Sequence, residues 1–306
     1  MITHHWPTPQ RPPRVVVLGA SGFVGRHAVA HLASGGIETV PVASSQIDLC
    51  APTAIEQLRR LIRPDDALVF ISALTPEKGR DVRTFMRNLA MGESVAAALE
   101  RSPCAHVIYL SSDAVYADGI SLVRETSCAS PAAFYGLMHV ARERMLQRAL
   151  QGSRTPLLML RPCGIYGAGD THNAYGPNRF LRSALAERRI CLFGQGEERR
   201  DHLFVADLRR LIGLCLAHRS TGLLNAATGQ AVSFKAVAGL VTALCEGPIP
   251  IESAPRQSPV THRHFDVTAL MRAFPSFRMT PISEGLLEMS RQLREDVHMA
   301  QVASAS

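Results

Sequence analysis

The chain has 306 residues, of which 46% are hydrophobic and 19% charged, a composition typical of a folded globular protein that excludes global disorder. Its net charge of +7 comes almost entirely from arginine, because Lys78 and Lys235 are the only lysines. No block of five or six like charges and no mixing of aromatic with basic residues is present, so we expect no nucleic-acid partner.

The sequence also argues against a membrane protein and against a protein held together by disulfides or a metal. No apolar run approaches the roughly 20 residues that span a bilayer, so we expect no membrane association. The seven cysteines are scattered without a Cys-x-x-Cys pair, which favours reduced thiols over disulfides or a metal site. We therefore predict a cytoplasmic protein that holds no metal.

The chain order predicts a polar, flexible tail over residues 1–13, followed by short apolar runs that alternate with helical patterns. Strands that are apolar throughout and separated by helices indicate a parallel sheet covered on both faces. We predict a doubly wound, Rossmann-type α/β domain over residues 14–165. A smaller C-terminal lobe, residues 166–306, is expected to bind substrate, with residues 221–232 returning a strand to the main sheet. The predicted strands of the first domain are 15–18, 39–42, 67–71, 107–110 and 157–160.

A glycine-rich turn directly follows the first predicted strand and opens a helix. Glycine permits a tight turn and a close approach of backbone to a diphosphate, and the helix N-terminus supplies amide donors. The turn therefore predicts binding of a dinucleotide. Its expected cofactor-binding residues are Gly19, Ser21, Gly22, Phe23, Val24 and Gly25, with Arg26 just beyond.

The end of the second strand bears on which dinucleotide binds. It runs into Ser44 without the acidic residue that would hold the adenosine ribose hydroxyls and repel a 2′-phosphate. The cofactor is thus NAD or NADP, with a slight preference for NADP. Arg26 is a candidate partner for the 2′-phosphate or an ordinary surface arginine.

Two short motifs carry a resemblance to a known family. Ser111-Ser112-Asp113-Ala114-Val115-Tyr116 follows a strand, and Tyr135-Gly-Leu-Met-His139 opens a helix about nineteen residues later. With the glycine turn, these motifs resemble the extended short-chain dehydrogenase/reductase family, the NAD-dependent epimerase/dehydratase group that acts mostly on nucleotide sugars. The resemblance covers roughly residues 14–290.

The resemblance implies a nicotinamide-dependent enzyme in which Tyr135 transfers a proton and Ser112 orients the reacting oxygen. It implies that Asn88, in the helix after the third strand, supports a proton relay. It also places Asp48, Leu49 and Ala73 at the cofactor.

Position 139 departs from the family, which has a lysine where this chain has His139. In the family this lysine holds the nicotinamide ribose and lowers the pKa of the tyrosine. A cation about 4 Å from a phenolate contributes about 4 kcal/mol at an effective dielectric of 20, nearly 3 pKa units. A neutral imidazole provides little of this stabilisation of the phenolate. The rate of carbonyl reduction, in which the tyrosine donates its proton, should therefore fall less than the rate of alcohol oxidation. The alternatives are a protonated His139, or a ring that packs under the cofactor without catalytic weight.

On the substrate side, Arg200 matches the family position that binds the substrate diphosphate, and a forked donor suits two phosphate oxygens. Its alternative is an ion pair with Asp201 or Asp207. Weaker candidates for the same ligand are Asn178 and Arg179. The sequence Asp113-Ala114 lacks the glutamate of the family's dehydratases, so Asp113 is expected to bind substrate.

The sequence therefore predicts an NAD(P)-dependent oxidoreductase or epimerase of nucleotide sugars, with a reductase favoured. Two alternatives stay open: a catalytically impaired dinucleotide-binding protein, and a reductase of an unrelated small carbonyl compound. Amphipathic helices near 82–100 and 135–150 resemble those through which the family dimerises, so a homodimer is expected, although their apolar stripes could equally be core.

Overall fold

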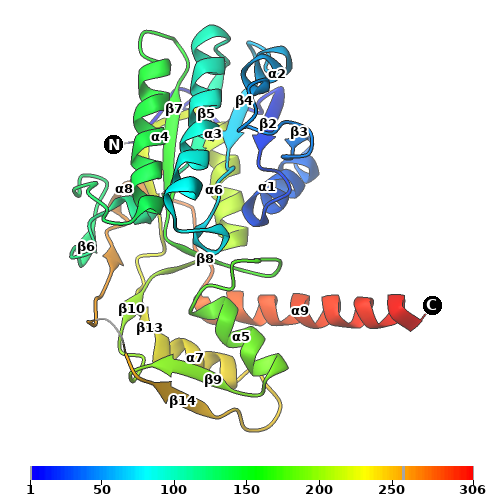
Figure 1. Ribbon diagram of the computed structural model, residues 1–306, viewed down its shortest axis with the longest axis vertical. Coiled ribbons are helices and arrows are strands. Elements are labelled where there is room, and N and C mark those ends of the chain that lie inside the picture. The colour runs from blue at the N-terminus through cyan, green and yellow to red at the C-terminus, as the bar shows by residue number, and fades with distance from the viewer. Residues whose placement is uncertain (1, 257–258, 306) are drawn as a thin grey trace.

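A seven-stranded sheet forms the centre of the molecule, as seen in the computed structural model, which describes residues 2–256 and 259–305 (Figure 1). The strand order is β1-β12-β7-β5-β4-β2-β3, and all neighbours are parallel except the pair of β1 and β12. The strands are β1 (Thr3–His4), β2 (Arg14–Leu18), β3 (Glu38–Val42), β4 (Ala67–Phe70), β5 (His106–Leu110), β7 (Leu157–Pro162) and β12 (Ser220–Ala226).

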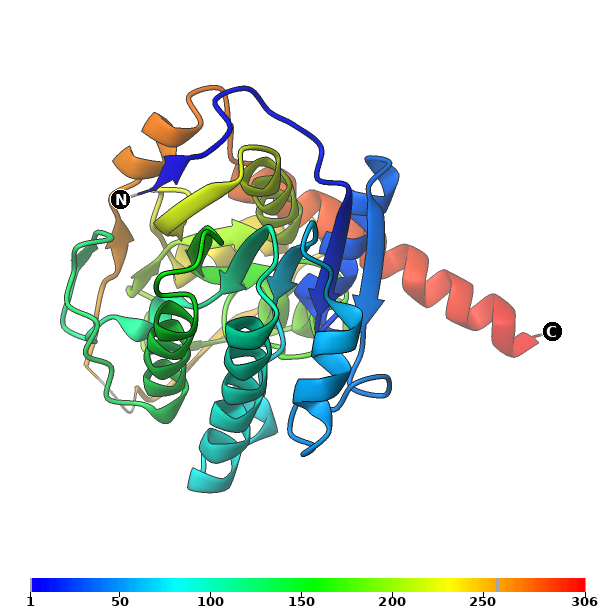
Figure 2. The same ribbon diagram turned by 90° about the horizontal axis from the view of Figure 1, so that it is seen from above.

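Helices cover both faces of this sheet, which confirms the predicted doubly wound α/β class (Figures 1 and 2). Every residue of β2, β4 and β5 is buried, the burial expected of strands with a helical layer on each side. Two separate hydrophobic clusters lie on the two faces. One face carries α1 (Phe23–Ser34), α6 (Val205–Ala217) and α8 (Thr268–Ala273), and the other α2 (Ala54–Leu61), α3 (Val82–Arg101) and α4 (Phe134–Ala149).

The N-terminal segment differs from the expected loose tail. Within its described part, Thr3 and His4 form β1, which pairs antiparallel with the edge strand β12. The His4 ring contacts the Ser220 hydroxyl at 2.9 Å and the Ala273 carbonyl at 3.1 Å. The polar composition of this segment, rich in proline and histidine, predicted a tail. The edge of β12 offers unpaired backbone groups, however, and two residues are enough to pair with them.

The chain beyond residue 163 alternates between the main sheet and a smaller lobe with its own hydrophobic cluster. Helices α5 (Pro177–Ala186) and α7 (Phe234–Thr242) pack there with the start of α9 (Ile282–Ala305), which then extends away from the body (Figure 1). Four two-stranded sheets join β8 (Gly164–Tyr166) to β11 (His202–Phe204), β9 (Ile190–Phe193) to β14 (Ile251–Ala254), β10 (Arg199–Arg200) to β13 (Val232–Ser233), and β6 (Leu122–Val123) to β15 (His264–Phe265).

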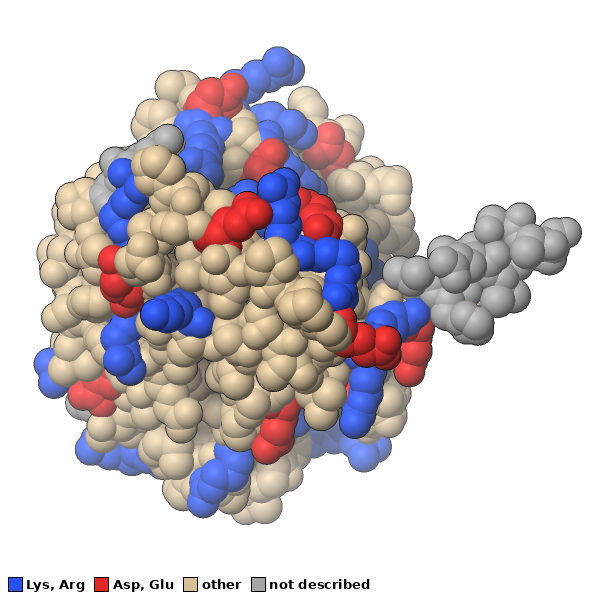
Figure 3. Space-filling model, turned by 90° about the horizontal axis from the view of Figure 1, so that it is seen from below, with Lys and Arg blue, Asp and Glu red and all other residues tan. Residues whose placement is uncertain are grey.

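Charges of both signs intermingle on the lower face of the molecule, which Figure 3 shows from below. In the smaller lobe, Arg189 forms ion pairs with Glu187 and Glu252, and Arg256 with Glu197. None of the helices in the described residues has the length and apolar character needed to cross a membrane.

The strand order reverses direction at β2, and this reversal positions the site. β3 lies on one side of β2 and β4 on the other, all three parallel. The loops that leave the carboxyl ends of β2 and β4 therefore diverge to opposite faces of the sheet and leave a crevice between them. Ligands of open α/β sheets bind at this kind of reversal.

Candidate active site

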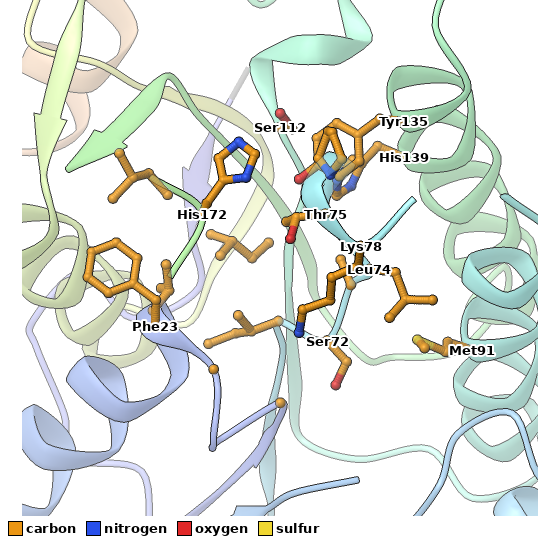
Figure 4. Close-up of a pocket in the computed structure, with 18 of the residues that line it drawn as sticks. Phe23, Ser72, Leu74, Thr75, Lys78, Met91, Ser112, Tyr135, His139 and His172 are labelled. Carbon is orange, nitrogen blue, oxygen red and sulfur yellow. The ribbon is translucent and has the colours of Figure 1, made fainter. Parts of the chain in front are cut away.

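A cavity of about 510 Å³ lies at the carboxyl ends of β2, β4 and β5. Figure 4 shows Ser112, Tyr135 and His139 near one another, with Phe23 and His172 elsewhere on its wall. Many of the residues expected at the cofactor, the catalytic centre or the substrate line it together: Gly19, Ser21, Gly22, Phe23, Val24, Ser44, Asp48, Leu49, Ala73, Ser112, Asp113, Tyr135 and His139.

The glycine turn is shaped by its neighbours in space. Gly19 has φ +91°, and a Cβ there would lie 2.8 Å from the backbone nitrogen of Ser72, which follows β4. A Cβ on Gly25 would lie 2.1 Å from the Gly19 carbonyl, so the turn has no room for a side chain at this position. Gly25 itself does not line the cavity. The first turn of α1 contains no acidic residue, so its positive end stays available to an anion. This cradle suits the diphosphate of a dinucleotide.

Arg26 lies outside the cavity wall, although it adjoins the glycine turn. Its guanidinium donates to the Ser21 carbonyl at 2.8 Å and to the Gly169 carbonyl at 3.1 Å. The Arg26 side chain thus links the glycine turn to the loop after β8. These contacts favour an ordinary surface arginine over a partner for the 2′-phosphate.

The Ser112 hydroxyl and the Tyr135 ring come from the starts of two helical segments. Ser112 caps the 3-10 helix η2 (Asp113–Val115) by accepting from the Ala114 amide at 3.1 Å, and Tyr135 is the second residue of α4. Burial, the nearby Tyr109 hydroxyl and the Asp113 carboxylate raise the pKa of Tyr135, while Arg142 opposes them. Tyr135 therefore carries its proton at neutral pH.

His139 lies under Tyr135, with the two ring centroids 4.7 Å apart and nearly perpendicular. It is 1% exposed, and its Nδ1 lies 2.7 Å from the Tyr109 hydroxyl. Burial, followed by the charges of Arg142 and Arg161, lowers the pKa of His139 well below its usual value. The imidazole is therefore neutral, which argues against the protonated alternative.

The nearest buried cation on α4 is Arg142, one turn after His139. It is fully buried and donates to the Asn88 carbonyl at 2.8 Å, the Asn88 side chain at 3.2 Å and the Ser72 carbonyl at 2.8 Å. Gly92 makes room for it, since a Cβ there would lie 2.6 Å from the Arg142 Cγ. Arg142 lies at i+3 from His139, so helical spacing was the signal that could have revealed it.

Asn88 does not line the cavity. Its amide group exchanges two 2.9 Å hydrogen bonds with the backbone of Leu74, which does line it. The Asn88 side chain also accepts a hydrogen bond from Arg142. Asn88 therefore shapes the loop after β4, which borders the site.

Asp113 faces the cavity and is held by an arginine from far along the chain. Arg263 donates to the Asp113 carbonyl at 3.2 Å and pairs with its carboxylate at 3.5 Å. Burial raises the pKa of Asp113, and the Arg263 charge opposes that rise. The sequence contained no signal for this pair, because 150 residues separate its members.

Arg200 lies on β10, outside the wall of the cavity. It forms an ion pair with Glu198 and donates to the Thr261 hydroxyl at 2.9 Å. The expected competing partners are engaged elsewhere, because Asp201 accepts from Thr228 and Asp207 from Thr280. A substrate diphosphate at Arg200 would have to compete with Glu198.

The other two substrate candidates do not meet the cavity. Asn178 is buried and bridges the Gly167 amide, at 3.0 Å, to the Asp170 carboxylate, at 2.5 Å. Arg179, the next residue on α5, points to a separate surface hollow beside Glu187 and Glu252. Successive helical residues diverge by about 100°, so one residue that faces the interior turns its neighbour outward.

Several residues that line the cavity were not predicted from the sequence, among them Glu77 and Lys78 in the 3-10 helix η1 (Pro76–Lys78), and His172 after β8. His172 Nδ1 lies 2.5 Å from the Glu77 carboxylate, which joins two loops at the cavity. Lys78 extends into the cavity in Figure 4 and is the only lysine or arginine among the described residues that line it.

Comparison with known proteins places this site in a family context. The model of the NAD dependent epimerase/dehydratase family matches residues 15–227. The chain is 24% identical to ADP-L-glycero-D-manno-heptose-6-epimerase of Cupriavidus pinatubonensis over 74% of this chain and 76% of that protein. It is 26% identical to dTDP-4-dehydro-6-deoxy-D-allose reductase of Streptomyces bikiniensis over 92% of this chain and 96% of that protein.

Solved structures agree with the fold. UDP-glucose 4-epimerase of Thermus thermophilus, in complex with NAD, superposes with a TM-score of 0.81 at 21% identity, covering 92% of this chain and 99% of that one. A GDP-L-fucose synthetase of Naegleria fowleri bound to NADP gives 0.84 at 15% identity, covering 95% and 96%. The family model spans the sheet from β2 to β12 and the whole glycine turn, and the chain belongs to the NAD dependent epimerase/dehydratase family.

Proposed function

We propose that the protein is an NAD(P)-dependent oxidoreductase or epimerase that acts on a nucleotide sugar, and that carbonyl reduction is its favoured direction. One observation carries the proposal: the glycine turn, Ser112 and Tyr135 line one cavity. Both relatives act on nucleotide sugars by name, and the reductase matches nearly the full length of this chain.

The residues that line the cavity are suited to bind a dinucleotide. Gly19 and Gly22 leave backbone exposed beside the N-terminus of α1, and Ser44 leaves a neutral wall at the end of β3. NADP is slightly preferred, because no acidic residue ends β3 to repel a 2′-phosphate. The bound dinucleotide supplies hydride to, or accepts it from, the carbon that bears the reacting oxygen.

The residues of the chain supply the proton and the orientation. Tyr135, which holds its proton at neutral pH, donates it to the carbonyl oxygen as the alcohol forms. The Ser112 hydroxyl positions that oxygen. The reverse reaction needs a phenolate, which neutral His139 does not stabilise, so the site favours reduction over oxidation.

Binding and turnover test the proposal in two steps. NADPH and NADH should each quench or enhance intrinsic fluorescence with saturation, NADPH at the lower concentration. A thermal-shift screen of nucleotide sugars then identifies the substrate, and Tyr135→Phe should lower its reduction at least a hundredfold without weakening NADPH binding. Turnover that survives Tyr135→Phe unchanged would show that another group donates the proton.

We further propose that the protein is a homodimer joined through α3 and α4. Large apolar side chains lie exposed on these adjacent helices, with Val82 59%, Met86 55%, Phe134 39% and Leu137 38% exposed. Sedimentation should report a dimer that Met86→Glu dissociates, while Met271→Glu, at a 40% exposed methionine on α8, leaves it intact. A monomeric wild-type protein would contradict this assembly.

A further inference from the structure

The ring of His139 has one satisfied nitrogen and one that lacks a partner. Nδ1 lies 2.7 Å from the Tyr109 hydroxyl, whereas Nε2 is buried and makes no hydrogen bond with any described residue. The side chain is 1% exposed and forms part of the cavity wall. A buried polar atom without a partner beside a binding cavity is a candidate contact for a ligand.

The hydroxyl of Tyr109 determines which nitrogen carries the proton. Tyr109 is fully buried on β5, and burial raises its pKa to about 12, so it keeps its hydrogen. This hydroxyl forms a hydrogen bond with His139, and the Arg142 guanidinium lies beside it. The neighbouring cation, Arg142, has only donors and cannot accept that hydrogen.

Two tautomers are possible, and their unsatisfied groups differ. If Tyr109 donates to Nδ1, the proton lies on Nε2 and a single donor awaits the ligand. If Nδ1 carries the proton and donates to Tyr109, the tyrosine hydrogen and the Nε2 lone pair are both left unpaired. Each buried unpaired group costs free energy, so the first arrangement is the stable one.

We propose that Tyr109 is a positioning residue that holds His139 as a neutral imidazole with its proton on Nε2, and that this N–H donates to a ribose hydroxyl of the bound dinucleotide. The identity of the ligand rests on the proposed function, whereas the tautomer rests on the Tyr109 contact alone. His139 thus keeps the ribose contact that a lysine would make and omits its charge.

Nuclear magnetic resonance on the whole protein tests the tautomer without any ligand. In protein labelled with ¹⁵N-histidine, the His139 signals are identified by their loss in His139→Phe. We expect one neutral form, protonated on Nε2, from about pH 5 to about pH 9. Tyr109→Phe should populate the Nδ1-protonated form. Tyr116→Phe, which removes another buried hydroxyl bonded to Asn225, should leave the His139 signals unchanged.

Fluorescence titration with NADPH and NADH tests the ligand contact. Loss of one hydrogen bond should weaken binding roughly fivefold in His139→Phe, and Tyr109→Phe should weaken it by a similar factor. Because Tyr109 acts through His139, the double variant should bind no more weakly than His139→Phe alone. Circular dichroism of each variant excludes unfolding as the cause.

The outcomes separate this inference from the proposed function. A wild-type His139 protonated on Nδ1, or one that titrates within that pH range, overturns the assigned tautomer. Additive losses in the double variant overturn the positioning role. If neither NADPH nor NADH binds, the proposed function fails, and the tautomer measurement still decides the arrangement of Tyr109 and His139.

Discussion

Three side chains set the acid–base properties of the cavity at the scale of single residues. Burial of Tyr135 strengthens its hold on its proton, burial of His139 keeps the imidazole neutral, and Arg142 supplies a cation whose hydrogen bonds all go to Asn88 and Ser72. A phenol in this setting is present in its protonated form at neutral pH, and the phenolate that alcohol oxidation requires is scarce. The proposed preference for reduction follows from these surroundings rather than from Tyr135 itself.

Substitution His139→Lys should increase alcohol oxidation at neutral pH by about tenfold or more and move its optimum to lower pH. An ammonium about 4 Å from the phenolate stabilises it by about 4 kcal/mol at an effective dielectric of 20, reduced here by repulsion from Arg142. A lower pKa for Tyr135 lets the phenolate form at lower pH. The measurement is kcat/KM for NAD(P)⁺-linked oxidation across pH.

The neutral variant His139→Met serves as the control for this substitution. It changes the packing under Tyr135 without adding a charge, so its oxidation profile should not move to lower pH. If His139→Lys gives the wild-type profile, the electrostatic account of position 139 fails.

At the scale of elements, the site depends on how closely α4 docks on η2. Gly136 follows Tyr135, and a Cβ there would lie 2.1 Å from the Ala114 carbonyl and 2.5 Å from the Pro131 side chain. The absence of a side chain at Gly136 therefore lets the two helical segments meet. Their contact holds Tyr135 and Ser112 at the same cavity.

Substitution Gly136→Ala should lower the free energy of unfolding by about 1–3 kcal/mol, because backbone must shift to admit the methyl group. The shift moves Tyr135 relative to Ser112, so turnover should fall at least tenfold. Urea unfolding and steady-state rates measure the two effects. Gly239→Ala on α7, where nothing lies within 4 Å of the added Cβ, should instead stabilise by roughly 0.5–1 kcal/mol.

At the scale of the whole molecule, two buried histidines make the free energy of unfolding depend on pH. His106 on β5 contacts the Ser220 carbonyl of β12 at 2.7 Å through Nε2, and His202 lies on β11. Burial, with a smaller effect of neighbouring arginines, lowers the pKa of each to about 4. The folded protein therefore holds both rings neutral at pH values where the unfolded chain would protonate them.

The stability contributed by these neutral rings is fully present above pH 6.5 and is lost as pH falls toward 4. Each ring changes the free energy of unfolding by about 1.4 kcal/mol per pH unit within this window, because the unfolded chain binds the proton first. His106→Gln keeps a donor for the Ser220 carbonyl and removes one titrating ring. Its urea-unfolding free energy should fall less steeply with decreasing pH, and an equal slope would contradict the assignment.

Local patterns in the sequence were sufficient to predict the architecture. Apolar runs between helical repeats indicated a parallel sheet, and glycines after the first strand indicated the turn, because burial and backbone freedom depend on the residue and its near neighbours. The same patterns suggested the wrong state for the start of the chain, since β1 exists only where β12 offers an open edge.

The amino-acid sequence by itself determined the sheet, the family and the candidate serine, tyrosine and histidine of the site. Only the tertiary structure decided the state of those side chains. Tyr109 reaches His139, Arg263 reaches Asp113 and Arg142 reaches Ser72 across separations of 30, 150 and 70 residues. Protonation depends on burial and on charges a few ångströms away, and folding alone brings such distant residues together.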